Sequence, residues 1–170
     1  MFRRKWGVLI GAALMGFFAV QDVIAETIAG KAVAVRPSAV VFGQKGKTSL
    51  LTGMEVVAGD RIKTDEKGQA QLLFSDGTKL VVGPKSSLVI ESYLLRSNNR
   101  VNDFTVRALG GSFRMITGKS KKNAYKIKTP TATIGVRGTS FDFTVEPNGT
   151  TAVLLFQGVA RVCAQNGTCK

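Results

Sequence analysis

The densest group of chemically capable side chains in this 170-residue sequence is a cluster of lysines. Five of them fall within ten residues: Lys119, Lys121, Lys122, Lys126 and Lys128. Ammonium groups at this spacing create a local positive field that attracts anionic groups and that salt screens. We therefore treat the cluster as the candidate interaction surface. The alternative is a solvated strand edge, because lysines also protect such edges against aggregation.

A second candidate is a corner of the backbone formed by Gly135, Arg137 and Gly138, with Asp142 as the expected partner of the arginine. The guanidinium of Arg137 is a planar fork of donors that fits a carboxylate. Glycines on both sides of it suggest a constrained bend. We favour a structural role, in which an ion pair or bonds to carbonyl groups hold the corner, because buried arginines are usually paired.

Catalytic chemistry has little support in this sequence. The chain contains no histidine, which is the commonest general base, so Ser-His-Asp and Cys-His arrangements are excluded. The acidic residues are scattered, and no predicted helix follows Gly135 and Gly138 to make a phosphate-binding loop. We therefore expect a protein that is not an enzyme, with no catalytic residues and no cofactor.

The two cysteines, Cys163 and Cys169, are expected to form a disulfide. The residues between them include Asn166-Gly167, a strong turn signal that would bring the two sulfur atoms together across a short hairpin at residues 163–170. A metal site is disfavoured, because there is no histidine and no second cysteine pair. The spacing also differs from the C-x-x-C pattern of redox-active pairs.

The N-terminus has the pattern of an export signal that would form a helix. Arg3, Arg4 and Lys5 precede an apolar run from Trp6 to Val20. Small residues at positions 23 and 25 then predict cleavage after Ala25 and a mature chain that is periplasmic. Because the apolar run is shorter than a usual membrane span, an uncleaved inner-membrane anchor is the alternative.

Charge and compartment together restrict the expected partners. The formal net charge is +13, and the first 25 residues hold three basic residues and one acid, so residues 26–170 keep +11. Long-range attraction to anionic partners follows from this charge, and in an exported protein the expected partners are not nucleic acids. They are another periplasmic or membrane protein, or an anionic envelope component such as lipopolysaccharide, glycan or lipid headgroups.

The elements that must position these residues are predicted to be strands. From Tyr125 to Val145 the pattern indicates two strands joined at the glycine-bracketed bend, with Phe141, Phe143 and Val145 on one face. Similar candidates recur about every ten residues along the chain, with turn residues between them, which predicts an all-β sandwich, barrel or solenoid. Ile62-Lys63-Thr64 recurs as Ile127-Lys128-Thr129, an echo that fits two turns of a coiled β structure or a coincidence.

Five short motifs follow one another along the chain. They are G-D-R-I-K-T at residues 59–64, F-S-D-G-T-K-L at 74–80, a glycine-bearing strand at 110–116, K-T-P-T-A-T-I-G-V-R-G-T-S-F at 128–141, and Q-G-V-A-R-V at 157–162. In this respect the chain resembles the FecR domain family. The resemblance implies a periplasmic, twisted β-solenoid-like or β-sandwich-like domain over residues 55–162, after an N-terminal β segment at 26–54.

In iron-regulatory members, the resemblance implies a cytoplasmic anti-sigma segment before a membrane helix and a C-terminal part that receives a signal from an outer-membrane transporter. Here only Met1 to Lys5 precede the apolar run and the sequence stops at Lys170, so we expect neither attachment. The expected function is a stand-alone, non-enzymatic signalling or scaffold module that binds another envelope protein. The alternative is a module that binds an anionic envelope component through the lysine cluster.

Overall fold

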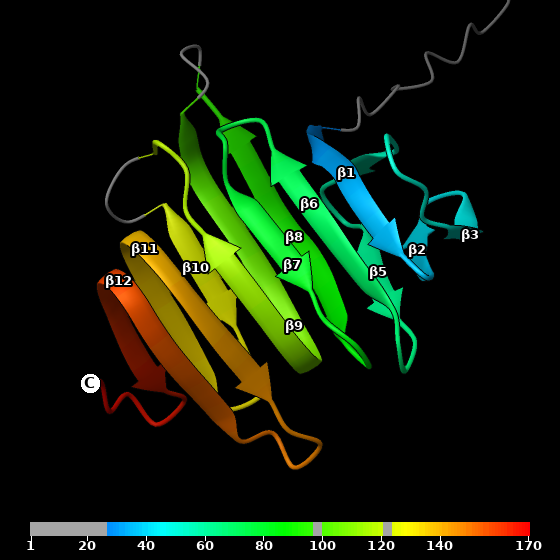
Figure 1. Cartoon of the computed structure of the whole chain (residues 1–170). Coiled ribbons are helices and arrows are strands. Elements are labelled where there is room, and N and C mark those ends of the chain that lie inside the picture. Colours follow the sequence, from blue (N-terminus) through cyan, green and yellow to red (C-terminus); the bar gives the residue numbers. More distant parts are fainter. Residues whose placement is uncertain (1–26, 97–99, 121–123) are drawn as a thin grey trace, which may run out of the picture.

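The computed structural model describes residues 27–96, 100–120 and 124–170, and in these residues the chain is all-β, as the sequence predicts (Figure 1). The expected export signal lies outside the described residues. In the described part of the chain, no helix has the length and hydrophobicity needed to span a membrane. The strands are β1 (Ile28–Arg36), β2 (Ala39–Gly43), β3 (Gly46–Ser49), β4 (Glu55–Val57), β5 (Arg61–Thr64), β6 (Gln69–Phe74), β7 (Lys79–Val82), β8 (Ser87–Leu95), β9 (Val101–Ile116), β10 (Tyr125–Lys128), β11 (Ala132–Val145) and β12 (Thr151–Ala164).

All of these strands belong to one sheet. Its main path runs β3-β2-β5-β8-β9-β7-β6-β1-β4, and β10, β11 and β12 extend it from β9. Neighbouring strands are antiparallel except for β9 and β10, which are parallel. A stack of in-register coils would pair its strands mainly in parallel. The motif echo suggested such a coil, but here the sheet is mainly antiparallel and it folds over on itself.

The sheet folds over because its long strands change neighbours along their length. The first half of β9 pairs with β8 and β10, whereas its second half, from Gly111, pairs with β7 and β11. Gly111 has a φ of 104°, and a Cβ there would collide with Ser86, so this corner requires glycine. The result is two facing layers, with β7, β6 and β1 in front of β8 and β5 in Figure 1.

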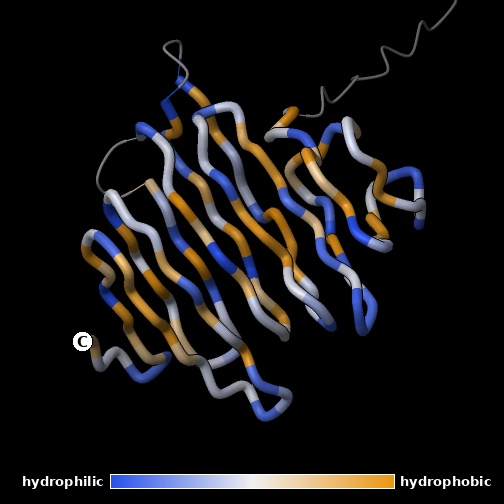
Figure 2. The backbone as a smooth tube through the Cα atoms, viewed as in Figure 1, coloured by the Kyte–Doolittle hydropathy of each residue, from blue (hydrophilic) through white to orange (hydrophobic). Residues whose placement is uncertain are grey.

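The hydrophobic core lies between these two layers. Phe74 of β6 contacts Tyr93 of β8 and Phe104 of β9, with ring centroids 5.5 Å and 4.7 Å apart, although β6 pairs with neither of those strands. All three rings are at most 2% exposed. Figure 2 shows hydrophobic and hydrophilic residues alternating along the central strands, the period expected when one face of a sheet is buried.

The motif echo corresponds to equivalent places in the sheet. Ile62-Lys63-Thr64 ends β5, and Ile127-Lys128 ends β10 with Thr129 directly after it; these two strands flank the β8–β9 pair in one layer. Both threonines are buried and bond a turn, which is the turn between β7 and β8 for Thr64 and the turn between β10 and β11 for Thr129. Thr64 Oγ1 accepts from the Ser86 N–H at 2.9 Å, and Thr129 Oγ1 accepts from the Ala132 N–H at 3.0 Å.

The expected bend at Gly135–Gly138 is only partly correct. Residues 129–131 form the turn between β10 and β11, and Gly135 lies within a regularly paired part of β11. The corner is at Gly138, which has a φ of 57°, and the register with β12 shifts between Arg137 and Ser140. A bulge of this kind lets one long strand change direction without ending.

The edge strands of the sheet differ strongly. The main path ends in β3 and in β4, which are four and three residues long, and β3 carries Lys47. The extension from β9 ends in β12, a strand of 14 residues whose one partner among the described strands is β11. Short, charged edge strands resist pairing with other chains, whereas a long apolar edge invites it.

Candidate functional site

The longest motif builds one surface from three strands. On β11, Ile134 and Val136 point into the core, and on β10 Tyr125 and Ile127 do the same, because alternate residues of a strand face opposite sides. The residues between them lie on the outer face. Gly135 pairs with Lys126 on one side and with Arg161 of β12 on the other, so these three residues form one row across the strands.

A hollow of about 450 Å³ lies on this outer surface. Gly135 lines it together with Lys126 and Arg161 from its own row, and Thr133 and Arg137 line it along β11. A Cβ added at Gly135 would have no heavy atom within 4 Å, and its backbone is not in the left-handed region. The fold therefore does not require glycine at this position, but a larger side chain would stand in the hollow.

The cations around the hollow differ in their partners. Lys126 Nζ lies 3.8 Å from a carboxylate oxygen of Asp103. In the described residues Arg137 and Arg161 are both exposed and form no ion pair. The surface between β10 and β12 thus carries two positive charges that no carboxylate in the described residues neutralises.

The lysine cluster is not one uniform patch. Lys121 and Lys122 lie outside the described residues, and Lys119 is exposed after β9. Lys128 Nζ lies 2.8 Å from a carboxylate oxygen of Glu91, which also accepts from Arg107. Burial raises the pKa of Glu91, but the hydrogen bonds from Lys128 and Arg107 outweigh it, so the pKa lies below its usual value. Lys126 and Lys128 are therefore already engaged by carboxylates of neighbouring strands.

The expected partner of Arg137 is engaged elsewhere. Asp142 pairs with Arg114 of β9 through two bonds, Nε to Oδ1 at 2.6 Å and Nη2 to Oδ2 at 2.7 Å. These bonds raise the pKa of Arg114. The predicted Arg137–Asp142 pair is wrong because the corner at Gly138 separates the two residues, and register places Asp142 directly opposite Arg114. The guanidinium of Arg114 also lies 5.4 Å from the ring centroid of Phe156.

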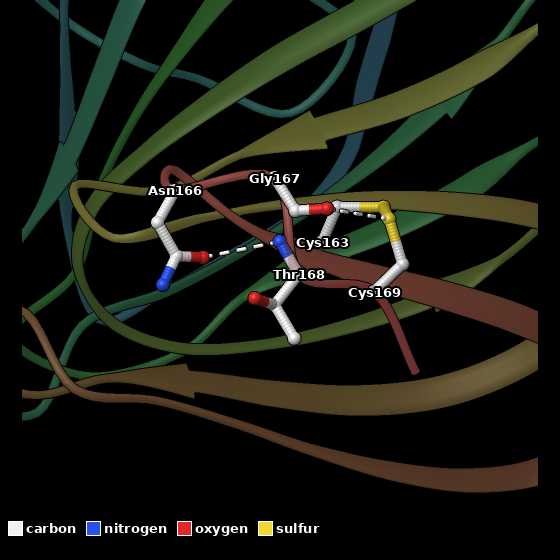
Figure 3. The surroundings of a disulfide bond; sticks show 5 residues. All are labelled: Cys163, Asn166, Gly167, Thr168 and Cys169. Carbon is white, nitrogen blue, oxygen red and sulfur yellow. Dashed lines mark hydrogen bonds between the residues drawn. A yellow bond between two sulfur atoms is a disulfide. The ribbon is translucent and has the colours of Figure 1, made fainter.

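The free edge of β12 is bordered by a disulfide hairpin. Cys163 and Cys169 are bonded, as the sequence predicts, and Asn166 Oδ1 accepts from the Thr168 N–H in the turn between them (Figure 3). Val162 and Lys170 exchange backbone hydrogen bonds of 2.9 Å and 2.8 Å. The hairpin therefore covers the last residues of β12, and in the described part of the chain the edge at residues 151–161 has no neighbouring strand.

This edge carries large apolar side chains. Residues 152–156 read A-V-L-L-F, a continuous apolar run. A run of this type is typical of a strand that is buried on both faces. In the structure the exposed fractions are 59% for Leu154, 42% for Leu155, 54% for Phe156 and 63% for Val159.

A buried polar centre at Asp76 was missed by the sequence analysis. Asp76 is 5% exposed and lies in the turn between β6 and β7. Its carboxylate accepts from Tyr125 Oη at 2.6 Å, from Ser120 Oγ at 3.0 Å, and from the N–H and Oγ1 of Thr78, both at 3.0 Å. Asp76-Gly77 is a pair of residues typical of a hairpin turn, but nothing local in the sequence points to tyrosines 17 and 49 residues further along the chain.

Burial and the contact with Asp76 change the pKa values of Tyr93 and Tyr125. Burial, and then the charge of Asp76, raise the pKa of Tyr93 to about 12. Burial and the hydrogen bond to Asp76 also raise the pKa of Tyr125. Tyr93 Oη donates to Asp76 Oδ1 at 3.4 Å, and Tyr125 Oη donates to Asp76 Oδ2 at 2.6 Å, so both hydroxyls stay protonated. We interpret the centre as a lock, a buried set of hydrogen bonds that joins the β6–β7 hairpin to β8 and β10.

Comparison with known proteins gives one match. A family model described as FecR protein matches residues 60–161. This span contains β5 to β11 and most of β12, and with them the Asp76 centre, the hollow and the apolar edge. No curated protein and no solved structure matches the chain.

Proposed function

This chain belongs to the FecR family, and on that premise we propose that it is a non-enzymatic module of the cell envelope that signals by binding another envelope protein. FecR domains are signalling-related, which supports the general class of function. The export pattern of residues 1–25 supports a periplasmic location. The observation that carries the proposal is the outer edge of β12, which pairs with no strand of the described residues.

An edge of this kind is suited to strand addition. Its unpaired N–H and C=O groups are available to hydrogen-bond with an extended segment, and the flanking side chains provide specificity. A strand added at this edge would contact the apolar side chains of residues 152–156 across the pair and shield part of their exposed surface from water. Edges that must stay unpaired are usually short, charged or interrupted by proline, whereas β12 has 14 residues, no proline and a single charged residue, Arg161.

The occupant that fits this edge is an extended segment of a different, acidic protein. Arg137 and Arg161 lie beside the edge without carboxylate partners in the described residues. A second copy of this chain would bring the same positive charges and the same net charge, which opposes its approach. Binding of an anionic envelope component through the lysine cluster is less well supported, because Lys126 and Lys128 already contact carboxylates.

Site-specific photocrosslinking in the producing cells tests the proposal. A benzophenone side chain replaces Leu154 on the β12 edge, and in a matched control it replaces Thr48 on the β3 edge. We expect the Leu154 position to give a defined adduct with another envelope protein, and peptide mapping should place the crosslink in an extended acidic segment. The Thr48 position should give none. No adduct at Leu154, an adduct with a second copy alone, or equal adducts at both positions would contradict the proposal.

A further inference from the structure

We infer that the hollow at Gly135 is a carboxylate-binding site, in which Arg137 and Arg161 hold acidic side chains of the segment that pairs with β12. This inference rests on the proposed function and gives the partner a chemical signature. The segment would be an extended strand that carries Asp or Glu side chains on its outer face.

The register of β12 places the hollow beside the available edge. Val162 directs its N–H and C=O away from β11, because both bond to Lys170. Ala160 lies two residues earlier in the same strand, so its backbone groups point the same way. A strand of another molecule that lies along β12, next to the C-terminal hairpin, would therefore form its backbone hydrogen bonds with Ala160. Arg161, the next residue, lies on the outer face and lines the hollow.

The glycine at position 135 supports a binding role for this hollow. A Cβ there would meet nothing within 4 Å, so packing and backbone conformation leave the position open to other residues. In a strand, glycine loses conformational entropy and contributes no side-chain packing, so it is an unfavourable choice without a second reason. Close approach of another molecule to the backbone supplies that reason.

The positive charge around the hollow indicates that its ligand is a carboxylate. Two guanidinium groups, those of Arg137 and Arg161, border the hollow and make no ion pair in the described part of the chain. Asp142 is held by Arg114 and Asp103 lies next to Lys126, so neither competes for these arginines. Guanidinium groups bind carboxylates through paired, charge-assisted hydrogen bonds. Because side chains of an added strand alternate, acidic residues two positions apart would lie on the same face as both arginines.

A binding assay with defined peptides tests the inference without knowledge of the natural partner. The probes are a fluorescein-labelled peptide, Val-Glu-Val-Glu-Val-Thr-Val, and the same peptide with both Glu replaced by Gln. Fluorescence anisotropy with the purified exported chain measures Kd at low salt. We expect the Glu peptide to bind at least about tenfold more tightly than the Gln peptide, because a carboxylate forms charge-assisted hydrogen bonds with a guanidinium and the neutral amide does not. High salt should reduce this difference.

Three variants examine the site itself. Arg137→Gln and Arg161→Gln should each remove most of the preference for the Glu peptide, and Lys47→Gln on the opposite edge should leave it unchanged. Gly135→Leu keeps every charge but fills the hollow, and it should also weaken binding of the Glu peptide by about tenfold. Circular dichroism confirms that each variant remains folded before binding is compared.

The outcomes separate this inference from the proposed function. Equal binding of the Glu and Gln peptides, no binding of either, or an unchanged preference in the arginine variants overturns the carboxylate site. If the Leu154 crosslink persists in the Arg137→Gln, Arg161→Gln double variant, the edge still binds a partner but the hollow does not recognise its acids. Loss of the crosslink in the double variant and its retention in Lys47→Gln support the inference.

Discussion

Replacing Asp76 by alanine should be among the most destabilising single changes in the chain. The carboxylate is buried and accepts four hydrogen bonds of 2.6–3.0 Å, which come from Tyr125, Ser120 and Thr78. Its backbone N–H also donates to Tyr93 Oη at 3.0 Å. The alanine variant removes every acceptor on this side chain at once and leaves buried hydroxyl groups without their partner.

The size of the effect follows from these contacts. A hydrogen bond to a charged group contributes about 1.5–3 kcal/mol, and a buried donor that loses its partner costs about 1–3 kcal/mol. The contacts form one network and do not add, so we expect a loss of about 4 kcal/mol in the free energy of unfolding, within the range for breaking a buried charged pair. Asp76→Asn keeps one acceptor oxygen and should lose about 2 kcal/mol. Against a typical domain stability of about 5–15 kcal/mol, the alanine variant would be marginally folded.

Urea unfolding followed by far-ultraviolet circular dichroism measures these differences. Asp142→Ala is the matched control, because Asp142 also accepts two short hydrogen bonds, but from Arg114 at the surface. The control should lose about 0.2–1 kcal/mol, as exposed ion pairs do. If Asp76→Ala is no less stable than Asp142→Ala, the interpretation of the buried centre as a lock is wrong.

Three further predictions concern corners, the disulfide and alkaline pH. Gly111→Ala should lower the free energy of unfolding by about 2 kcal/mol or more, because its φ is positive and its Cβ would collide with a neighbour. Gly135→Ala should leave it unchanged or raise it by up to about 1 kcal/mol, because alanine fits there and loses less entropy than glycine; urea titration compares the two. Cys163→Ser with Cys169→Ser should cost about 2 kcal/mol or less, since the closed loop is short, and hydrogen exchange should increase at the end of β12. Tyr93 has a pKa near 10 in the unfolded chain and about 12 in the folded protein, so its protonated hydroxyl stabilises the fold fully below about pH 10. This stability should be lost between about pH 10 and 12, and the melting temperature should fall over the same range. A melting temperature that stays constant there would contradict the raised pKa.

Local pattern was sufficient to predict the fold class and one covalent link. Alternation at Phe141, Phe143 and Val145 identified their buried face, and Asn166-Gly167 identified the hairpin that brings the two cysteines together. These features depend on side-chain period and turn chemistry, both of which act over a few residues. The all-β prediction is confirmed for the same reason.

The site depends on contacts that local pattern does not encode. The register of β9 with β11 decides that Asp142 meets Arg114, and nothing near Arg137 in the sequence reveals it. The Asp76 centre joins residues as far apart as 76 and 125. Gly135 and Gly138 look alike in the sequence, yet only Gly138 adopts a positive φ. Pairing between distant strands settles each of these points.

The unequal ends of the sheet also limit how large an assembly can grow. Growth of a filament requires two complementary edges on each copy, so that every addition creates a new site. Among the described strands β12 is the one long edge, whereas the edge strands β3 and β4 have four and three residues and offer little to pair with. The strand addition that we propose would therefore occupy the long edge, and we expect a complex that stops growing and no filament.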